Sequence, residues 1–201
     1  GTMITKKYRE YFISTLAMSG STLIASIVDM ILVGHLISPR AMSAITLTSP
    51  VVFIVNVVFG LYIYGGNTLA ATYKGGRDSE NANKCFTIAV LGGMLTSLFL
   101  AVIGLLFFRQ LAGLLCIGNE ALYQPVLEYL LPLLFMGPFA ILVNGMAAFV
   151  RSDGLSGLAL AIPLVTNTVN LMLDYVFMVG FKLGIRGASL ATDVGFACAL
   201  I

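Results

Sequence analysis

Long runs without a charged residue set the strongest limit on what this chain can fold into. The longest run covers residues 41–73, and others cover residues 85–108, 129–150 and 154–173. Each run matches or exceeds the roughly 20 apolar residues that a helix needs to cross a bilayer. Soluble domains carry about 25% charged residues, whereas this chain of 201 residues carries 10%. We therefore expect an integral membrane protein, which excludes a soluble enzyme or a disordered regulator.

The uncharged runs predict helical spans. They are too long for the strands of a membrane barrel, and the alternating pattern of such strands is absent. We expect an all-α polytopic membrane protein that forms a single lobe over residues 1–201, with five complete spans and a truncated sixth. The predicted spans are residues 11–36, 44–73, 85–108, 122–150, 155–181 and 187–201.

The second span is expected to be kinked or broken. Its 33 uncharged residues would form a helix of about 50 Å, which exceeds the roughly 30 Å hydrocarbon layer. Pro50, Gly60, Gly65 and Gly66 are the residues that can interrupt it. The fourth and fifth spans also contain prolines, namely Pro132, Pro138 and Pro163. These interruptions predict helices that bend around a cavity.

The distribution of basic residues predicts the orientation. Seven lie on the side of the N-terminus: Lys6, Lys7, Arg9, Lys74, Arg77, Lys84 and Arg151, the last between spans four and five. Four lie on the other side: Arg40, Arg109, Lys182 and Arg186. The excess predicts a multi-pass protein of the cytoplasmic membrane with a cytoplasmic N-terminus.

Other compositional features exclude further classes. Cys85, Cys116 and Cys198 are widely spaced and form no CxxC pair, so they predict neither a disulfide framework nor a metal cluster. The net charge of +2 is too small to indicate a nucleic-acid partner.

Acidic residues inside the spans are the strongest functional candidates, because a charge in the membrane interior is costly. Asp29 lies in the first span, Asp174 near the end of the fifth and Asp193 in the sixth. Two of them continue polar stripes at helical spacing. The first stripe contains Ser19, Thr22, Ser26 and Asp29, and the second contains Asn167, Asn170 and Asp174. We expect the two stripes to face each other or shared water.

Paired acids of this kind suit ion coupling. Burial disfavours the charged form of a carboxyl group, and a nearby second carboxylate disfavours it further. A proton or a cation relieves that repulsion, and the Asn170 amide oxygen suits a hard cation. The alternative is purely structural, since polar residues in membrane helices often only bridge helices.

Four stretches carry a resemblance to a known family. They are Val28–Leu36 (VDMILVGHL), Gly145–Gly154 ending in VRSDG, Asn170–Tyr175 (NLMLDY) and Gly184–Thr192 (GIRGASLAT). In this order and spacing the chain resembles the amino-terminal lobe of a multidrug and toxic compound extrusion (MATE) transporter, within the larger superfamily that includes lipid-linked oligosaccharide flippases.

The resemblance implies half of a twelve-helix, two-lobe transporter with alternating access, whose carboxy-terminal lobe is missing here. It implies export of amphipathic or cationic compounds and drugs in exchange for H+ or Na+, with no cofactor and no enzymatic activity. The family's cation site matches Asp29, Asn170, Asp174 and Thr192, and Thr192 is indicated by the resemblance alone. Supporting polar residues would be Thr22, Ser26, Asn167 and Asp193. Asp193 departs from the family pattern, which has an apolar residue there.

Two further functions stay open. A lipid-linked sugar flippase would be expected to line its cavity with basic residues, whereas the predicted spans contain no Lys or Arg. An intramembrane aspartyl protease could use Asp29 and Asp174 as a dyad, but neither acid follows the Gly-x-Gly pattern of such enzymes.

Overall fold

The computed structural model describes residues 2–199, which are almost entirely helical. Five helical stretches in this part of the chain are long and apolar enough to cross a membrane, which confirms the predicted fold class. The stretches are Met3–Leu36, Ser49–Gly75, Ser79–Leu106, Glu120–Ser152 and Gly157–Gly180. A shorter helix, α9 (Ile185–Cys198), follows the fifth.

The predicted second span, residues 44–73, is interrupted twice. Helix α2 (Pro39–Leu47) ends before Thr48, and α3 (Ser49–Phe59) begins there with Pro50 in its first turn, where a missing amide hydrogen costs no helical bond. A π-helical turn, η1 (Gly60–Tyr64), then separates α3 from α4 (Gly65–Gly75). The structure therefore divides the predicted span 44–73 at Thr48 and again at the glycine-rich segment.

The π-helical turn η1 is held by its neighbour α5 (Ser79–Leu106). The Tyr62 hydroxyl is hydrogen-bonded to Thr96 Oγ1 at 2.9 Å. A Cβ placed on Gly92 would lie 2.8 Å from the Tyr62 ring, so only glycine leaves room for this contact. Tertiary packing thus fixes the place of the irregular turn.

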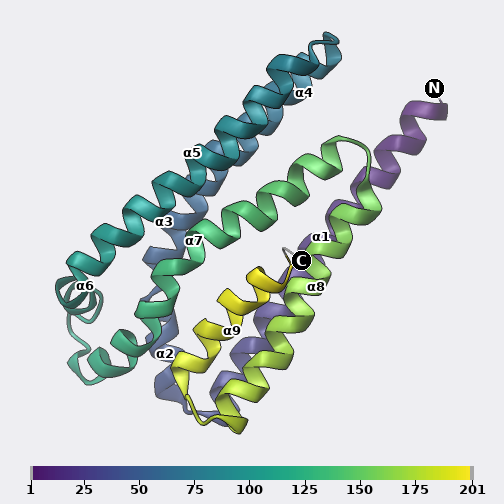
Figure 1. Cartoon of the computed structure of the whole chain (residues 1–201). Helices are drawn as coiled ribbons and strands as arrows, with labels where there is room; N and C mark the ends of the chain where they lie inside the picture. Colours follow the sequence, from purple (N-terminus) through teal and green to yellow (C-terminus); the bar gives the residue numbers. More distant parts are fainter. Residues whose placement is uncertain (1, 200–201) are drawn as a thin grey trace.

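Helix α7 (Tyr123–Ser152) is the centre of the bundle and contains Pro132 and Pro138. It packs against α5 on one side and against α8 (Ser156–Tyr175) and α9 on the other. Figure 1 shows α1 (Thr2–Leu36), α8 and α9 side by side, with α3, α4 and α5 forming a second group across α7. The fold therefore consists of two helix groups joined by α7.

Small residues allow the close approach of α5 to α7. Ala89, Gly93, Ser97, Ala101 and Gly104 are buried along one face of α5. A Cβ on Gly104 would lie 2.6 Å from Leu134 of α7. Small residues at such spacing are typical of membrane helix interfaces, where close backbone packing replaces the hydrophobic effect.

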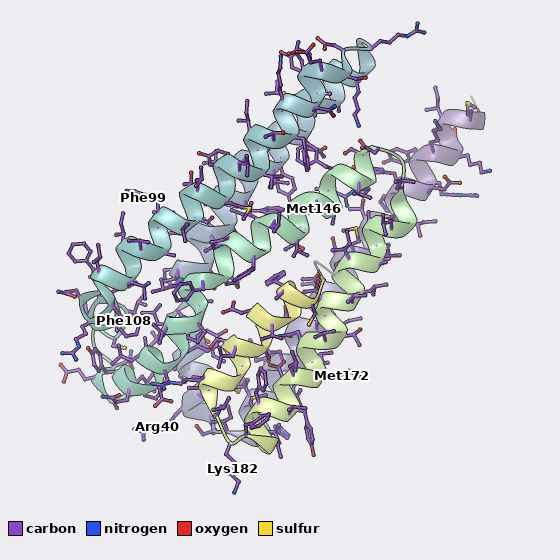
Figure 2. All side chains as sticks on the ribbon, viewed as in Figure 1. Arg40, Phe99, Phe108, Met146, Met172 and Lys182 are labelled. Atoms are coloured by element: carbon purple, nitrogen blue, oxygen red, sulfur yellow. The ribbon has the colours of Figure 1, made fainter. Side chains whose placement is uncertain are left out.

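Large apolar side chains cover the outside of the bundle. Phe99 of α5 and Met172 of α8 are about two-thirds exposed and point away from it (Figure 2). Arg40 and Lys182 lie at the end of the bundle opposite the N-terminus (Figures 1 and 2). The outer surface is thus suited to lipid, with these basic residues at one end.

Candidate functional site

The acid pair lies between α1 and α8. Asp174, in the last turn of α8, is fully buried, and no donor of another residue forms a hydrogen bond with either of its carboxyl oxygens. Asp29 approaches from α1, and its Oδ1 is also buried without a partner. The two carboxyl groups are close enough to interact directly. Because two unsolvated carboxylates repel each other, the pair requires a proton or a cation to be stable.

An amide and a hydroxyl group lie one helical turn from this pair. Asn170 Nδ2 donates a hydrogen bond to Thr192 Oγ1 at 3.1 Å, and the Thr192 hydroxyl donates to the Ala188 carbonyl at 3.2 Å. Asn170 precedes Asp174 by four residues, so both side chains lie on the same face of α8. Helices α8 and α9 therefore bring amide and hydroxyl groups next to the acids.

Gly195 makes this arrangement possible. A Cβ at Gly195 would lie 3.1 Å from the Thr166 carbonyl oxygen and 3.2 Å from Asn170 Cβ. Gly195 lies three residues after Thr192, on the same face of α9. The absence of a side chain lets α9 approach α8 closely enough for the Asn170–Thr192 hydrogen bond.

The supporting polar residues differ in what they contact. Asn167 Nδ2 donates to Ser21 Oγ of α1 at 3.0 Å, which joins α8 to α1. By contrast, the hydroxyl groups of Thr22 and Ser26 donate to carbonyls of their own helix, Met18 at 3.1 Å and Thr22 at 3.0 Å. The α1 contact with Asn167 is thus made by Ser21, which the predicted stripe did not include.

Asp193 and Tyr129 extend the acid cluster towards α7. Asp193 is half-buried, and its Oδ1 has no hydrogen-bond partner. The Tyr129 phenol lies within the electrostatic reach of Asp29, Asp174 and Asp193. Sequence reasoning overlooked Tyr129, which directly follows Glu128 near the start of α7.

The side chains present suit a proton or a monovalent cation. Among residues 2–199, no three His, Cys, Asp or Glu side chains gather as a metal-binding group. The oxygen-bearing groups near the pair are instead two carboxyl groups, an amide and a hydroxyl. Oxygen ligands of this kind are preferred by hard cations.

A cavity of about 590 Å3 opens between the two helix groups, and the acid pair, Asn170 and Thr192 are not among the residues that line it. Phe196 of α9 lines it, one turn beyond Thr192. The other walls come from α1, α3, η1, α7 and α8 and are mainly apolar, with Thr22, Asn56 and Asn144 among the polar residues. Its volume and lining are in the range of sites for drug-sized ligands.

Arg151 also lines this cavity. The sequence had placed it between two spans, but it lies in the last turn of α7, because the chain turns only at Gly154, whose φ is +91°. The helix therefore runs beyond the predicted span 122–150, and Arg151 is the residue that follows the end of that span.

A bundle of bilayer-length helices that holds a buried acid pair and a separate, mainly apolar cavity has the architecture of one lobe of a helical membrane transporter. The MatE family model matches residues 15–176, and the chain therefore belongs to the MATE family of transporters. The predicted family and the absence of an enzymatic role are confirmed.

The chain is similar to curated multidrug exporters. It is 31% identical over 185 residues to the multidrug export protein MepA of Staphylococcus haemolyticus, covering 90% of this chain and 40% of the relative. It is 27% identical over 180 residues to MepA of Staphylococcus aureus strain MRSA252, with the same coverage. The chain thus spans less than half the length of the curated relatives that it matches.

Solved structures share the fold. An outward-facing multidrug resistance MATE transporter of the MOP superfamily superposes with a TM-score of 0.85 at 19% identity, over 96% of this chain and 43% of that one. A MOP superfamily transporter from Pyrococcus furiosus, described as having a binding pocket of reverse polarity, gives 0.85 at 19% identity, over 96% and 42%. MATE in a bent conformation gives 0.82 at 20% identity, over 96% and 43%.

Proposed function

We propose that the full-length protein is a cation-coupled multidrug exporter whose ion site lies in this lobe. Asp29 and Asp174 would bind the coupling ion, H+ or Na+, and the side-chain oxygens of Asn170 and Thr192 would complete the site for Na+. The observation that carries this proposal is Asp174, a fully buried acid whose carboxyl oxygens have no polar partner other than the second acid, Asp29. An intramembrane acid left in this state is difficult to explain by packing alone.

The cavity supports a role in binding the exported compound. Phe196 and Thr192 lie on the same face of α9, so the cavity wall and the ion site share a helix. Its mainly apolar lining favours amphipathic compounds, including the organic cations and drugs expected from the sequence. The MepA relatives are named as multidrug exporters.

The local geometry of α8 supports coupling between ion and cavity. Pro163 lies inside the helix, where its missing amide hydrogen removes one backbone hydrogen bond, and it lines the cavity. A π-helical turn, η3 (Val176–Gly180), begins two residues after Asp174, and such turns often accompany functional sites. Neutralising Asp174 would remove its repulsion from Asp29, and α8 has irregular points at which it can then bend.

The family assignment favours export over the alternatives. A protease is excluded because members of the family are transporters. A lipid-linked sugar flippase would be expected to have several basic residues around its cavity, and Arg151 is the one charged side chain among the described residues that line it. Within the cytoplasmic membrane, we propose a cytoplasmic N-terminus, in line with the seven basic residues on that side.

Transport by the full-length protein in proteoliposomes tests the proposal. Uptake of a fluorescent organic cation would be driven by an imposed Na+ or H+ gradient, for wild type, Asp29→Asn and Asp174→Asn. We expect each variant to lose gradient-driven transport. Glu120→Gln, which makes the same chemical change at an exposed acid of the turn η2 (Glu120–Leu122), should retain it. Normal transport by the Asp174→Asn variant would contradict an ion site in this lobe.

A further inference from the structure

A second pocket, of about 190 Å3, lies behind the wall of the cavity described above. It is formed by α3, α5, α6 (Phe108–Leu115) and α7. Val55 of α3 lines both spaces, so a layer of side chain separates them. Ser97 of α5 is the one residue with a polar side chain among the described residues that line the second pocket. The pocket is therefore an apolar space with a single hydroxyl group.

The Ser97 hydroxyl lacks a hydrogen-bond partner. The residue is 5% exposed, and its Oγ is buried with no donor or acceptor in reach. A serine or threonine inside a helix commonly donates to the carbonyl four residues earlier, as Ser43, Thr87 and Ser152 do in this chain. Because a buried donor without an acceptor is unfavourable, Ser97 is suited to a ligand that supplies an acceptor.

A glycine of α7 leaves room beside this hydroxyl. A Cβ on Gly137 would lie 3.2 Å from Ser97 Cβ and 3.4 Å from Ser97 Oγ. Gly137 also lines the pocket. The space next to the hydroxyl thus depends on the absence of a side chain at residue 137.

Water is a poor occupant of this space. A buried water molecule typically makes two to four hydrogen bonds, whereas the described lining offers one polar side chain. An apolar cavity of about 150 Å3 stays dry and binds benzene. A pocket of about 190 Å3 therefore suits an apolar compound slightly larger than benzene.

The pocket borders the outer surface of the bundle. Ile54, Leu100 and Ile103 line it and are 51%, 36% and 37% exposed. Ser97, Leu100 and Ile103 belong to the apolar helix α5, one of the five stretches long enough to cross a membrane. A compound dissolved in the bilayer can therefore reach the pocket from the lipid side.

We propose that this pocket binds a small, neutral carbonyl compound from the bilayer, such as a ketone or an ester. Its carbonyl oxygen accepts the hydrogen bond of the Ser97 hydroxyl, and its apolar body lies against the aliphatic wall. A carbonyl group suits the site better than an alcohol, because an alcohol brings a further hydroxyl hydrogen that no other described side chain of the lining can accept. The inference does not depend on the proposed ion site or on what the larger cavity binds.

Ligand-dependent stability of the full-length protein in detergent tests the role of Ser97. The probes are acetophenone and isopropenylbenzene, which has a CH2 group in place of the carbonyl oxygen and nearly the same shape. Both are titrated during thermal unfolding, since a compound that binds only the folded state raises its stability. Concentrations are expressed relative to detergent, so that partition into micelles is taken into account.

We expect wild type to bind acetophenone about threefold to tenfold more tightly than isopropenylbenzene, as for one hydrogen bond. Ser97→Ala should bind the two compounds equally. Ser43→Ala, at an exposed serine of α2 whose hydroxyl is bonded to its own helix, should keep the preference of wild type. Equal binding of both compounds to wild type, or an unchanged preference in Ser97→Ala, would overturn recognition of the carbonyl group.

Photolabelling of wild type locates the site without a variant that has to fold. An acetophenone that carries a diazirine is irradiated with the full-length protein in detergent and in nanodiscs, and labelled peptides are identified by mass spectrometry. We expect label at Ile54, Leu100 or Ile103 that excess acetophenone removes. Label at Met172, which is exposed on the outside of α8 (Figure 2), should persist as background. Ala101→Val, which adds bulk to the pocket lining, should lower the competed label.

Two labelling results would overturn the site. One is the absence of competed label at the pocket in wild type. The other is competed label in detergent that disappears in nanodiscs, because a lipid chain would then fill the pocket in a membrane.

Discussion

Replacing Gly195 by alanine should disturb the ion site from a distance. The added Cβ would lie 3.1 Å from the Thr166 carbonyl oxygen and 3.2 Å from Asn170 Cβ, both tighter than ordinary van der Waals contact. Overpacking of this kind costs about 1–3 kcal/mol, and the better helix propensity of alanine returns about 1 kcal/mol. The net effect is a destabilisation of roughly 0–2 kcal/mol.

The matched control is Gly20→Ala in α1. A Cβ at Gly20 meets nothing within 4 Å. The same substitution should therefore stabilise the protein by about 1 kcal/mol through helix propensity alone. The difference between the two variants, about 1–3 kcal/mol, isolates the steric contribution of the α8–α9 contact.

Thermal unfolding of the full-length protein in detergent, with and without Na+, measures both effects. Moving α9 away by a few tenths of an ångström lengthens the Asn170–Thr192 hydrogen bond from its 3.1 Å. Gly195→Ala should therefore also show weaker stabilisation by Na+ if Na+ is the coupling ion. The reasoning is refuted if Gly195→Ala and Gly20→Ala have the same stability. The contact between α9 and α8 would then have room for a side chain at residue 195.

Two further predictions concern other parts of the chain. Hydrogen bonds from the Asn81 amide and side chain hold the pKa of Asp78, before α5, below its ordinary value of 3.8. The stabilisation is present above that value and is lost as the pH falls through the lowered pKa, so the protection factor of the Asn81 amide (its exchange rate relative to that of an unfolded chain at the same pH) should fall only in that acid range; an unchanged protection factor would contradict the capping role. In a cysteine-free background of the full-length protein, a membrane-impermeant maleimide added to intact cells should label Lys182→Cys but not Arg77→Cys, and the reverse pattern would invert the proposed orientation.

The fold class could be predicted because it depends on local composition. A charge-free run that is long enough to cross a bilayer must satisfy its backbone hydrogen bonds internally, and a helix does so whatever the tertiary arrangement. The division of residues 44–73 was harder to place. The π-helical turn at Gly60–Tyr64 depends on the contact of Tyr62 with Gly92 and Thr96 of another helix, which no local pattern contains.

The candidate site could be predicted in part for a similar reason. Helical spacing identified Asp29, Asn170 and Asp174, since residues on one face of one helix are related by sequence distance alone. Thr192 was indicated by the resemblance to the family. Ser21 and Tyr129 were missed, because the rotation of α1 and α7 against α8 decides which of their side chains meet it.

Arg151 shows how a small shift in a helix boundary changes the interpretation. Placed in a loop, it counted only towards the orientation of the protein. Placed in the last turn of α7, it lines the cavity. Its location depends on the turn at Gly154, which has a positive φ of 91° and follows the helix rather than interrupting it.

The central claim is that Asp174 and Asp29 bind the coupling ion, and ligand-dependent stability tests it most directly. Thermal unfolding of the full-length protein in detergent would be followed against Na+ concentration and pH for wild type, Asp174→Asn and the control Glu120→Gln. An ion that binds only the folded state adds about 2.7 kcal/mol at 100 times its dissociation constant. The account predicts a Na+ or pH dependence that Glu120→Gln keeps and Asp174→Asn loses. The same dependence in Asp174→Asn as in wild type would contradict it.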